Sequence, residues 1–90
     1  MKCLIVGTDR LGAAPQILHR QLGVSSIVHW TGREKKLPEV LPKGLEVIVV
    51  YSQFTNHQLM WAVKKLAKKQ GIKTIYIRRG LSELSQIGTA

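Results

Sequence analysis

Residues suited to ligand binding follow four separate apolar runs of the 90-residue sequence. They are Asp9, Arg10, His29, Trp30, Arg33, Asn56, His57, Arg78 and Arg79. Guanidinium groups bind carboxylates and phosphates through paired hydrogen bonds, and a neutral imidazole is a good metal ligand. Loops are generally polar, but this set is richer in arginine, histidine and tryptophan than ordinary loops. The residue types therefore predict a site for an anionic ligand, with a histidine available for a metal.

His57 is the favoured metal ligand among the three histidines. It opens a predicted helix, where Asn56 or Thr55 suits the N-cap better than a histidine does. Its ring would then be free, and the positive end of the helix dipole favours the neutral imidazole. A structural hydrogen bond is the competing interpretation for His57 and for His29, and His19 is expected on the surface. No His-x-x-x-His pair or carboxylate cluster is present, so we expect no dedicated zinc site.

Strands and helices must position these residues. Short β-branched apolar runs predict strands over residues 2–7, 25–30, 45–52 and 72–77. Helical spacing of apolar residues predicts helices over 11–23, 54–70 and 81–87, with Pro15 in the first turn of the first helix. Strands that alternate with helices form a parallel sheet with right-handed crossovers. We predict one α/β domain over residues 1–90, with a four-stranded parallel, Rossmann-like or flavodoxin-like half sheet in the order 2-1-3-4, flanked by helices.

The predicted topology also locates the site. In an open parallel sheet, ligands bind beyond the carboxyl ends of the strands. Each candidate residue ends a predicted strand or follows one closely, so we expect them all at that edge. Segment 31–44 contains two prolines and much charge, and we predict a loop there with one short helical turn near 38–41. No full helix is predicted between the second and third strands, which would leave part of the sheet thinly covered. This gap favours a homodimer, in which the two chains could exchange an element.

The segment Gly-Thr-Asp-Arg-Leu-Gly at 7–12 has the position of a phosphate loop but not its sequence. It lacks the central glycine of G-x-G-x-x-G, and no Gly-Lys-Ser/Thr follows. We therefore expect no dinucleotide fingerprint or Walker loop. Asp9 is predicted to cap the first helix, or to pair with Arg10 or Arg78. Gly7 and Gly12 would allow a tight turn and a close approach of the backbone.

The chain is strongly basic, with a net charge of +9 from 14 Lys and Arg against 5 Asp and Glu. This balance predicts an anionic partner: a phosphorylated metabolite, an anionic cofactor or nucleic acid. The lysines of the 54–70 helix lie opposite its apolar stripe and are interpreted as a solvated face. A nucleic-acid patch is the weaker interpretation, because Trp61 is the only aromatic residue among these lysines and no nucleic-acid motif is visible.

The only cysteine, Cys3, lies in an apolar run and excludes an internal disulfide and a cysteine zinc cluster. We interpret it as a buried apolar residue. No secretory signal and no membrane-length apolar stretch is present, so we expect a cytoplasmic protein without membrane contact. The sequence contains no paired catalytic carboxylates, no Ser-His-Asp order and no activated cysteine. Whether the protein is an enzyme stays open, and a cofactor would carry any reaction.

Four motifs in order resemble the small bacterial family called domain of unknown function 2325. They are Leu-Ile-Val-Gly-Thr-Asp-Arg-Leu-Gly at 4–12, Ile-Val-His-Trp-Thr-Gly-Arg at 27–33, Phe-Thr-Asn-His-Gln-Leu-Met at 54–60 and Ile-Tyr-Ile-Arg-Arg-Gly-Leu-Ser at 75–82. The resemblance covers nearly the whole chain. The resemblance implies haem binding, which is described for some members as dimers with a histidine on the iron. Members of the family are also labelled dinucleotide-utilising, and that label rests on fold analogy alone.

The resemblance implies roles that the residue types can fill. His57 would be the axial iron ligand, with His29 as the other candidate, and the oxygen, peroxide or redox-sensing chemistry would belong to the haem. Arginines would hold the propionates, and large apolar residues would line the slot. The arginines are Arg10, Arg33, Arg78 and Arg79. The apolar residues of the slot are Trp30, Phe54, Leu59, Met60 and Trp61. The same arginines suit a nucleotide or phosphorylated metabolite, so that ligand remains the alternative.

Overall fold

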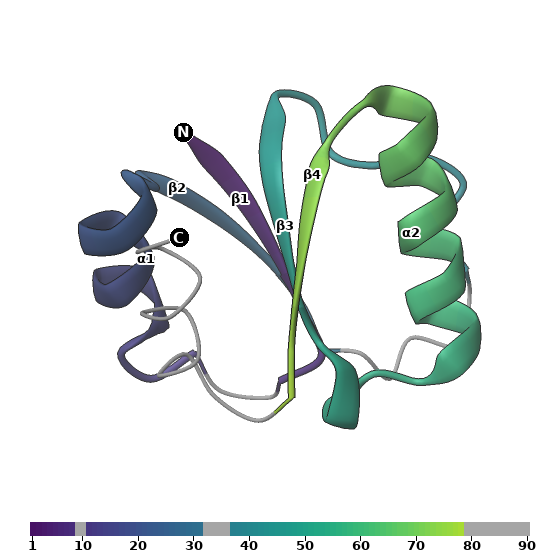
Figure 1. Cartoon of the computed structure of the whole chain (residues 1–90), viewed down its shortest axis with the longest axis horizontal. Helices are drawn as coiled ribbons and strands as arrows, with labels where there is room; N and C mark the ends of the chain where they lie inside the picture. The colour runs from purple at the N-terminus through teal and green to yellow at the C-terminus, as the bar shows by residue number, and fades with distance from the viewer. Residues whose placement is uncertain (9–10, 32–36, 79–90) are drawn as a thin grey trace.

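Four parallel strands form the central sheet of the protein, seen in a computed structural model that describes residues 1–8, 11–31 and 37–78. The strands are β1 (Lys2–Val6), β2 (Ser26–Trp30), β3 (Leu45–Tyr51) and β4 (Lys73–Ile77). Their order is β2-β1-β3-β4, and all neighbours are parallel (Figure 1). The predicted α/β class and the strand order are therefore confirmed. All four carboxyl ends lie at the lower edge of the sheet in Figure 1.

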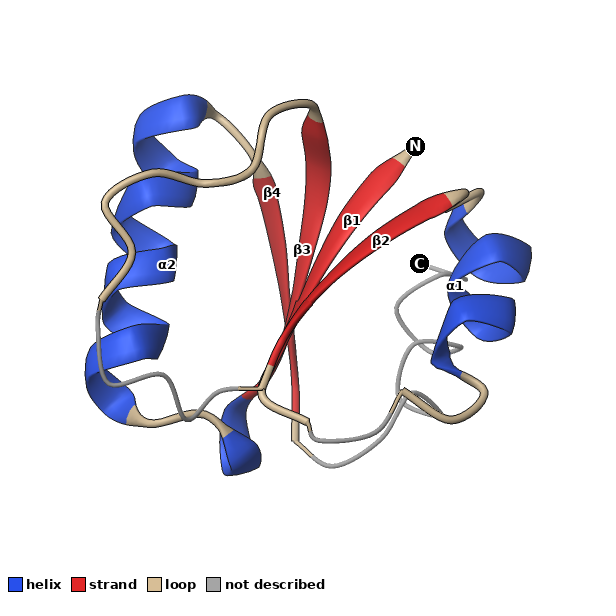
Figure 2. Ribbon diagram, turned by 180° about the vertical axis from the view of Figure 1, so that it is seen from behind, coloured by secondary structure: helices blue, strands red, loops and turns tan. Residues whose placement is uncertain are grey.

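Two helices cover opposite faces of this sheet, α1 (Ala14–Leu22) and α2 (His57–Gln70), as Figure 2 shows. A short 3-10 helix, η1 (Ser52–Phe54), follows β3. The central strands β1 and β3 are almost continuously buried, because each face of the sheet carries its own helix. Their apolar β-branched sequences, Lys-Cys-Leu-Ile-Val and Leu-Glu-Val-Ile-Val-Val-Tyr, suit this environment.

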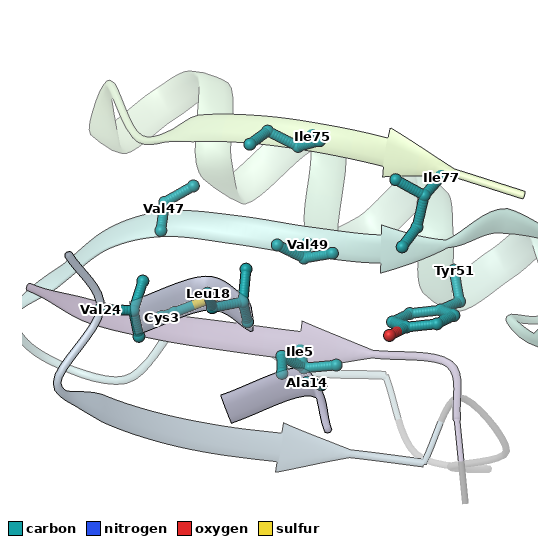
Figure 3. Close-up of a cluster of buried hydrophobic side chains, with 10 residues drawn as sticks. All are labelled: Cys3, Ile5, Ala14, Leu18, Val24, Val47, Val49, Tyr51, Ile75 and Ile77. Carbon is teal, nitrogen blue, oxygen red and sulfur yellow. The ribbon is translucent and has the colours of Figure 1, made fainter. Parts of the chain in front are cut away.

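Alternation along the strands divides the interior into two cores. The α1-side core contains Cys3, Ile5, Ala14, Leu18, Val24, Val47, Val49, Tyr51, Ile75 and Ile77 (Figure 3). The α2-side core contains Leu4, Val6, Leu41, Leu45, Ile48, Val50, Leu59, Val63 and Ala67. On α2 the buried residues recur at helical spacing, and Lys64, Lys65, Lys68 and Lys69 are exposed, as the sequence predicts.

Helix α1 begins at Ala14 and ends at Leu22, and Gly23 is its C-cap residue. Pro15 lies in the first turn, where its missing N–H breaks no helical hydrogen bond, as expected. The N-cap position is Ala13 and has no side-chain cap, so the prediction that Asp9 caps this helix is wrong. The helix cannot start much earlier, because Pro15 is tolerated only in the first turn. Gly23 ends the helix in a left-handed conformation and donates its N–H to the His19 carbonyl.

The link between β2 and β3 contains no helical turn at 38–41, where one was expected. The prolines Pro38 and Pro42 supply no backbone N–H, which removes donors that a turn would use. Leu41 instead packs into the α2-side core with 5% of its surface exposed. The described part of this link therefore covers the α2 side of the sheet. The predicted helix at 81–87 lies outside the described residues.

No helix within the described part of the chain is long and apolar enough to cross a bilayer.

Cys3 yields a testable consequence of this packing. Burial raises the pKa of its thiol from 9.0 to about 11, and a hydrogen bond with the Val49 backbone lowers the pKa to a smaller extent. We expect the thiol to resist alkylation near pH 8 in the folded protein and to react once urea unfolds the chain. Similar alkylation rates in the folded and urea-unfolded protein would contradict this burial.

The same pKa shift makes stability depend on pH. The folded-state pKa lies above the unfolded one, so the contribution of Cys3 is fully present below about pH 9 and is lost as pH rises towards 11. Urea unfolding across this range, with Cys3→Ala as the control, measures the effect. The alanine variant should lose less stability at high pH than the natural protein.

Candidate functional site

Hydrogen bonds hold the carboxyl ends of β2 and β1 together. The Gly7 N–H donates to the Trp30 carbonyl oxygen at 3.0 Å. The Nε2 atom of the half-buried His29 ring donates to the Thr8 carbonyl. The first residues after β1 therefore stay beside the end of β2.

A second contact joins the chain after β3 to the end of β4. The Ser52 hydroxyl donates to the Ile77 carbonyl oxygen at 3.2 Å. This bond places the start of η1 beside Arg78, the first residue after β4 and an exposed side chain. We call the region of η1, the start of α2 and Arg78 the η1–α2 corner, and the Ser52 hydroxyl links its two sides.

Gly7 is the point at which β1 meets the turn after β3. Its φ angle is +107°, and a Cβ atom there would lie 2.0 Å from Thr55 Oγ1 and 2.7 Å from the Tyr51 carbonyl oxygen. Thr55 is itself buried, and its hydroxyl donates to that same carbonyl at 2.9 Å. Only a residue without a side chain allows this approach. Gly7 therefore sets how closely the β1 edge and the entry to α2 can pack.

Asn56, not His57, caps helix α2. Its backbone is extended, and its side-chain oxygen accepts a hydrogen bond from the Leu59 N–H at 2.7 Å. The helix consequently starts at His57, three residues later than the predicted start at 54, because η1 and the cap occupy the intervening residues. The expectation that asparagine caps and histidine does not is confirmed.

This cap gives a prediction. We expect Asn56→Ala to lower the free energy of unfolding by about 1 kcal/mol, because the Leu59 N–H loses its acceptor. Asn56→Asp keeps an acceptor and should stay within about 0.5 kcal/mol of the natural protein. Urea unfolding of the three proteins measures the difference. Equal losses in the two variants would show that the cap bond contributes nothing.

The three histidine rings differ in their surroundings. His29 donates to the Thr8 carbonyl, and His19 Nδ1 donates to the Val24 carbonyl at 3.1 Å. His57 is exposed, and its ring makes no hydrogen bond within the described part of the chain. His29 pairs in register with Ile5 and so lies on the α1 face, whereas His57 starts the helix of the other face. The structure does not bring His29 and His57 together on one face.

The remaining predicted site residues fall into three groups. Trp30 is half-buried and packs against the α2-side core. Leu59 is fully buried in that core and Met60 packs against it, so neither forms an exposed slot, whereas Phe54 is 52% exposed. The last group, Asp9, Arg10, Arg33 and Arg79, lies outside the described residues.

Within residues 1–8, 11–31 and 37–78, no group of three or more His, Cys, Asp and Glu side chains could hold a metal ion. A haem iron makes a smaller demand, because the porphyrin supplies most of the coordination and the protein adds an axial residue. At the η1–α2 corner, His57 offers one exposed imidazole, Phe54 an exposed aromatic ring and Arg78 an exposed cation. That set matches the smaller demand.

Sequence reasoning missed one feature of α2. Trp61, assigned to the haem slot, is 71% exposed and lines a groove on the outer side of this helix, together with Lys65 and Lys69. The signal was present in the sequence, since Trp61 falls between the buried positions Leu59 and Val63 of the helix and so must face outward.

The fold and the corner described above define a small α/β domain with a parallel half sheet and an exposed histidine at a helix start. Residues 2–89 match the family model described as an uncharacterized protein conserved in bacteria (DUF2325), and the chain belongs to this family. The family resemblance drawn from the four motifs is confirmed. A search of curated proteins and a search of solved structures each returned no match.

Proposed function

We propose that this protein binds haem, with His57 as the axial ligand of the iron. One observation carries the proposal: His57 is exposed and its ring makes no hydrogen bond within the described residues, whereas His19 and His29 both donate to carbonyl oxygens. A ring already engaged through one nitrogen can ligate only through the other. The choice of His57 agrees with the expectation from the family resemblance.

The backbone around His57 supports a fixed ligand position. Asn56 caps α2, so His57 occupies the first helical position and not a frayed end. Thr55, the residue before the cap, is buried and bonded to Tyr51. A ligand on a rigid element keeps its orientation better than one on a free loop.

Phe54 and Arg78 would meet the other requirements of haem. Phe54 lies three residues before His57 and exposes 52% of its surface, which suits an apolar porphyrin face. Arg78 lies beyond the Ser52–Ile77 hydrogen bond and would pair with a propionate. The remaining propionate contacts would come from Arg10, Arg33 and Arg79. When bound, haem supplies oxygen, peroxide or electron-transfer chemistry, and the chain binds and orients it.

A haemin titration tests the proposal. We expect a saturable Soret band that differs from that of free haemin when the purified protein is titrated in reducing or oxidising buffer. No spectral change at any ratio would overturn haem binding. The alternative ligand, a nucleotide or phosphorylated metabolite held by the arginines, would instead raise the melting temperature, and Arg78→Ala would remove that rise.

We also propose that the protein forms a homodimer through an edge of its sheet. In the described sheet, β2 and β4 each have a neighbouring strand on one side only. Such edges pair readily with another chain. Light scattering of the purified protein with and without haemin measures the state, and a monomer under both conditions would contradict the dimer.

A further inference from the structure

The outer side of α2 carries a groove distinct from the η1–α2 corner. The groove lies between the helix and the β2–β3 link and has a volume of about 490 Å³. We call it the Trp61 groove, and the lining residues that matter here are Leu37, Pro38, Trp61, Lys65, Leu66 and Lys69. His57 does not line it. The groove therefore combines apolar surface with two ammonium groups one helical turn apart.

Trp61 is unusual in its exposure. The side chain exposes 71% of its surface, although tryptophan is buried in most proteins and its exposure needs a reason. The Lys65 Nζ atom lies 5.9 Å from the centroid of the indole ring, within the range of a cation–π contact. An aromatic ring held beside a cation, on a rigid helix, is the arrangement that stacks a nucleobase next to a phosphate.

The charged residues that line the groove, among those that the structure describes, are the two lysines Lys65 and Lys69. Helix α2 contains four lysines and no acidic residue in its sequence His-Gln-Leu-Met-Trp-Ala-Val-Lys-Lys-Leu-Ala-Lys-Lys-Gln. Neither Glu39 nor Glu46 lines the groove. Lys64 and Lys68 extend the positive surface beyond the groove itself, on a chain with a net charge of +9. This surface attracts a polyanion and repels a second copy of itself.

We propose that the Trp61 groove binds single-stranded nucleic acid. A base enters the groove and stacks on the indole above the apolar floor of Leu37, Pro38 and Leu66. The neighbouring phosphates contact Lys65 and Lys69. A duplex is a poorer fit, because its bases are stacked within the helix and unavailable to the indole. A free nucleotide would leave Lys64 and Lys68 unused, and an acidic peptide would have no base to place on the indole.

Fluorescence anisotropy with labelled single-stranded DNA and RNA of about 12 nucleotides tests this proposal at low and moderate salt. We expect binding that weakens steeply with salt and a roughly tenfold loss of affinity in Trp61→Ala. Because Trp61 is exposed, this variant should keep the natural melting temperature, and Trp61→Phe should retain most of the binding. Lys65→Gln combined with Lys69→Gln should weaken binding and flatten the salt dependence.

The control removes one positive charge from the opposite face and is compared with Lys65→Gln alone. Arg20 is exposed on α1, so Arg20→Gln should change the affinity by less than about twofold. Equal losses in Arg20→Gln and in Lys65→Gln, each of which removes one positive charge, would overturn the proposal in favour of diffuse attraction. Mononucleotides or an acidic peptide that bind as tightly as the oligonucleotide would also overturn it, as would no binding at low salt. His57→Ala should leave this binding intact, which separates it from the haem proposal.

Discussion

Replacing Gly7 with alanine is expected to lower the free energy of unfolding by about 3 kcal/mol or more, the largest stability effect that we predict for one added methyl group. Two costs add at this position. The φ angle of +107° is one that alanine rarely adopts. In addition, the new Cβ atom would meet Thr55 Oγ1 at 2.0 Å and the Tyr51 carbonyl oxygen at 2.7 Å. The carbonyl cannot move aside without displacing β3.

Gly71 provides the matched control. It ends α2 with a φ angle of +71°, yet a Cβ atom there would meet nothing within 4 Å. Gly71→Ala therefore costs only the backbone strain, about 1 kcal/mol. Urea unfolding of both variants measures the difference between strain alone and strain with a clash. Equal losses would show that Gly7 is not held against Thr55 as the structure has it.

The effect of Gly7→Ala should extend beyond stability. Gly7 also donates to the Trp30 carbonyl, so its displacement would disturb the ends of β2, β1 and β3 together. A variant that still folds should bind haemin less tightly than Gly71→Ala does. This contrast would link the packing of the carboxyl edge to the binding site.

The sheet was predictable because its signals are local. Each strand is an apolar β-branched run, and the glycines at 7, 23, 44 and 71 lie where strands or helices end or begin. Alternation of strands with helices then predicts parallel pairing, and the observed order β2-β1-β3-β4 follows. The cap of α2 was equally local, since the side chain of Asn56 reaches only three residues along the chain.

Contacts between distant segments were not predictable in the same way. Nothing in the sequence around Gly7 shows that Thr55 will lie against it, because that contact depends on how β1 and β3 pack. The start of α2 was missed for a related reason. Residues 52–54 form a 3-10 turn, and the Thr55 hydroxyl donates to the Tyr51 carbonyl. From their sequence alone, these residues could equally have extended the helix.

The sequence predicted that the candidate residues follow the strand ends, but not which face of the sheet each one occupies. The topology places every strand end at one edge, and the described members of the site are indeed there. Which ring faces which side depends on strand parity and register. His29 pairs with Ile5 and so faces α1, which a sequence without its register does not show.

Replacing His57 with alanine should reduce the affinity for haemin by about 100-fold or more. This loss exceeds the one that is typical when a residue hydrogen-bonded to a metal ligand is removed. The reason is direct, since the variant lacks the proposed iron ligand. His57 is exposed and makes no hydrogen bond within the described residues, so the change should alter the free energy of unfolding by no more than about 0.5 kcal/mol. Loss of binding would then report on the ligand and not on folding.

His29→Gln is the control for this variant. Glutamine keeps a donor for the Thr8 carbonyl, and the ring that it replaces lies on the α1 face. We expect this variant to bind haemin as the natural protein does. A loss confined to His29→Gln would transfer the ligand role to His29.

The most direct measurement is the absorption spectrum of three proteins, natural, His57→Ala and His29→Gln, each mixed with the amount of haemin that saturates the natural protein. Our account predicts the same Soret band for the natural protein and His29→Gln, and the spectrum of free haemin for His57→Ala. A natural Soret band in the His57→Ala protein would contradict it.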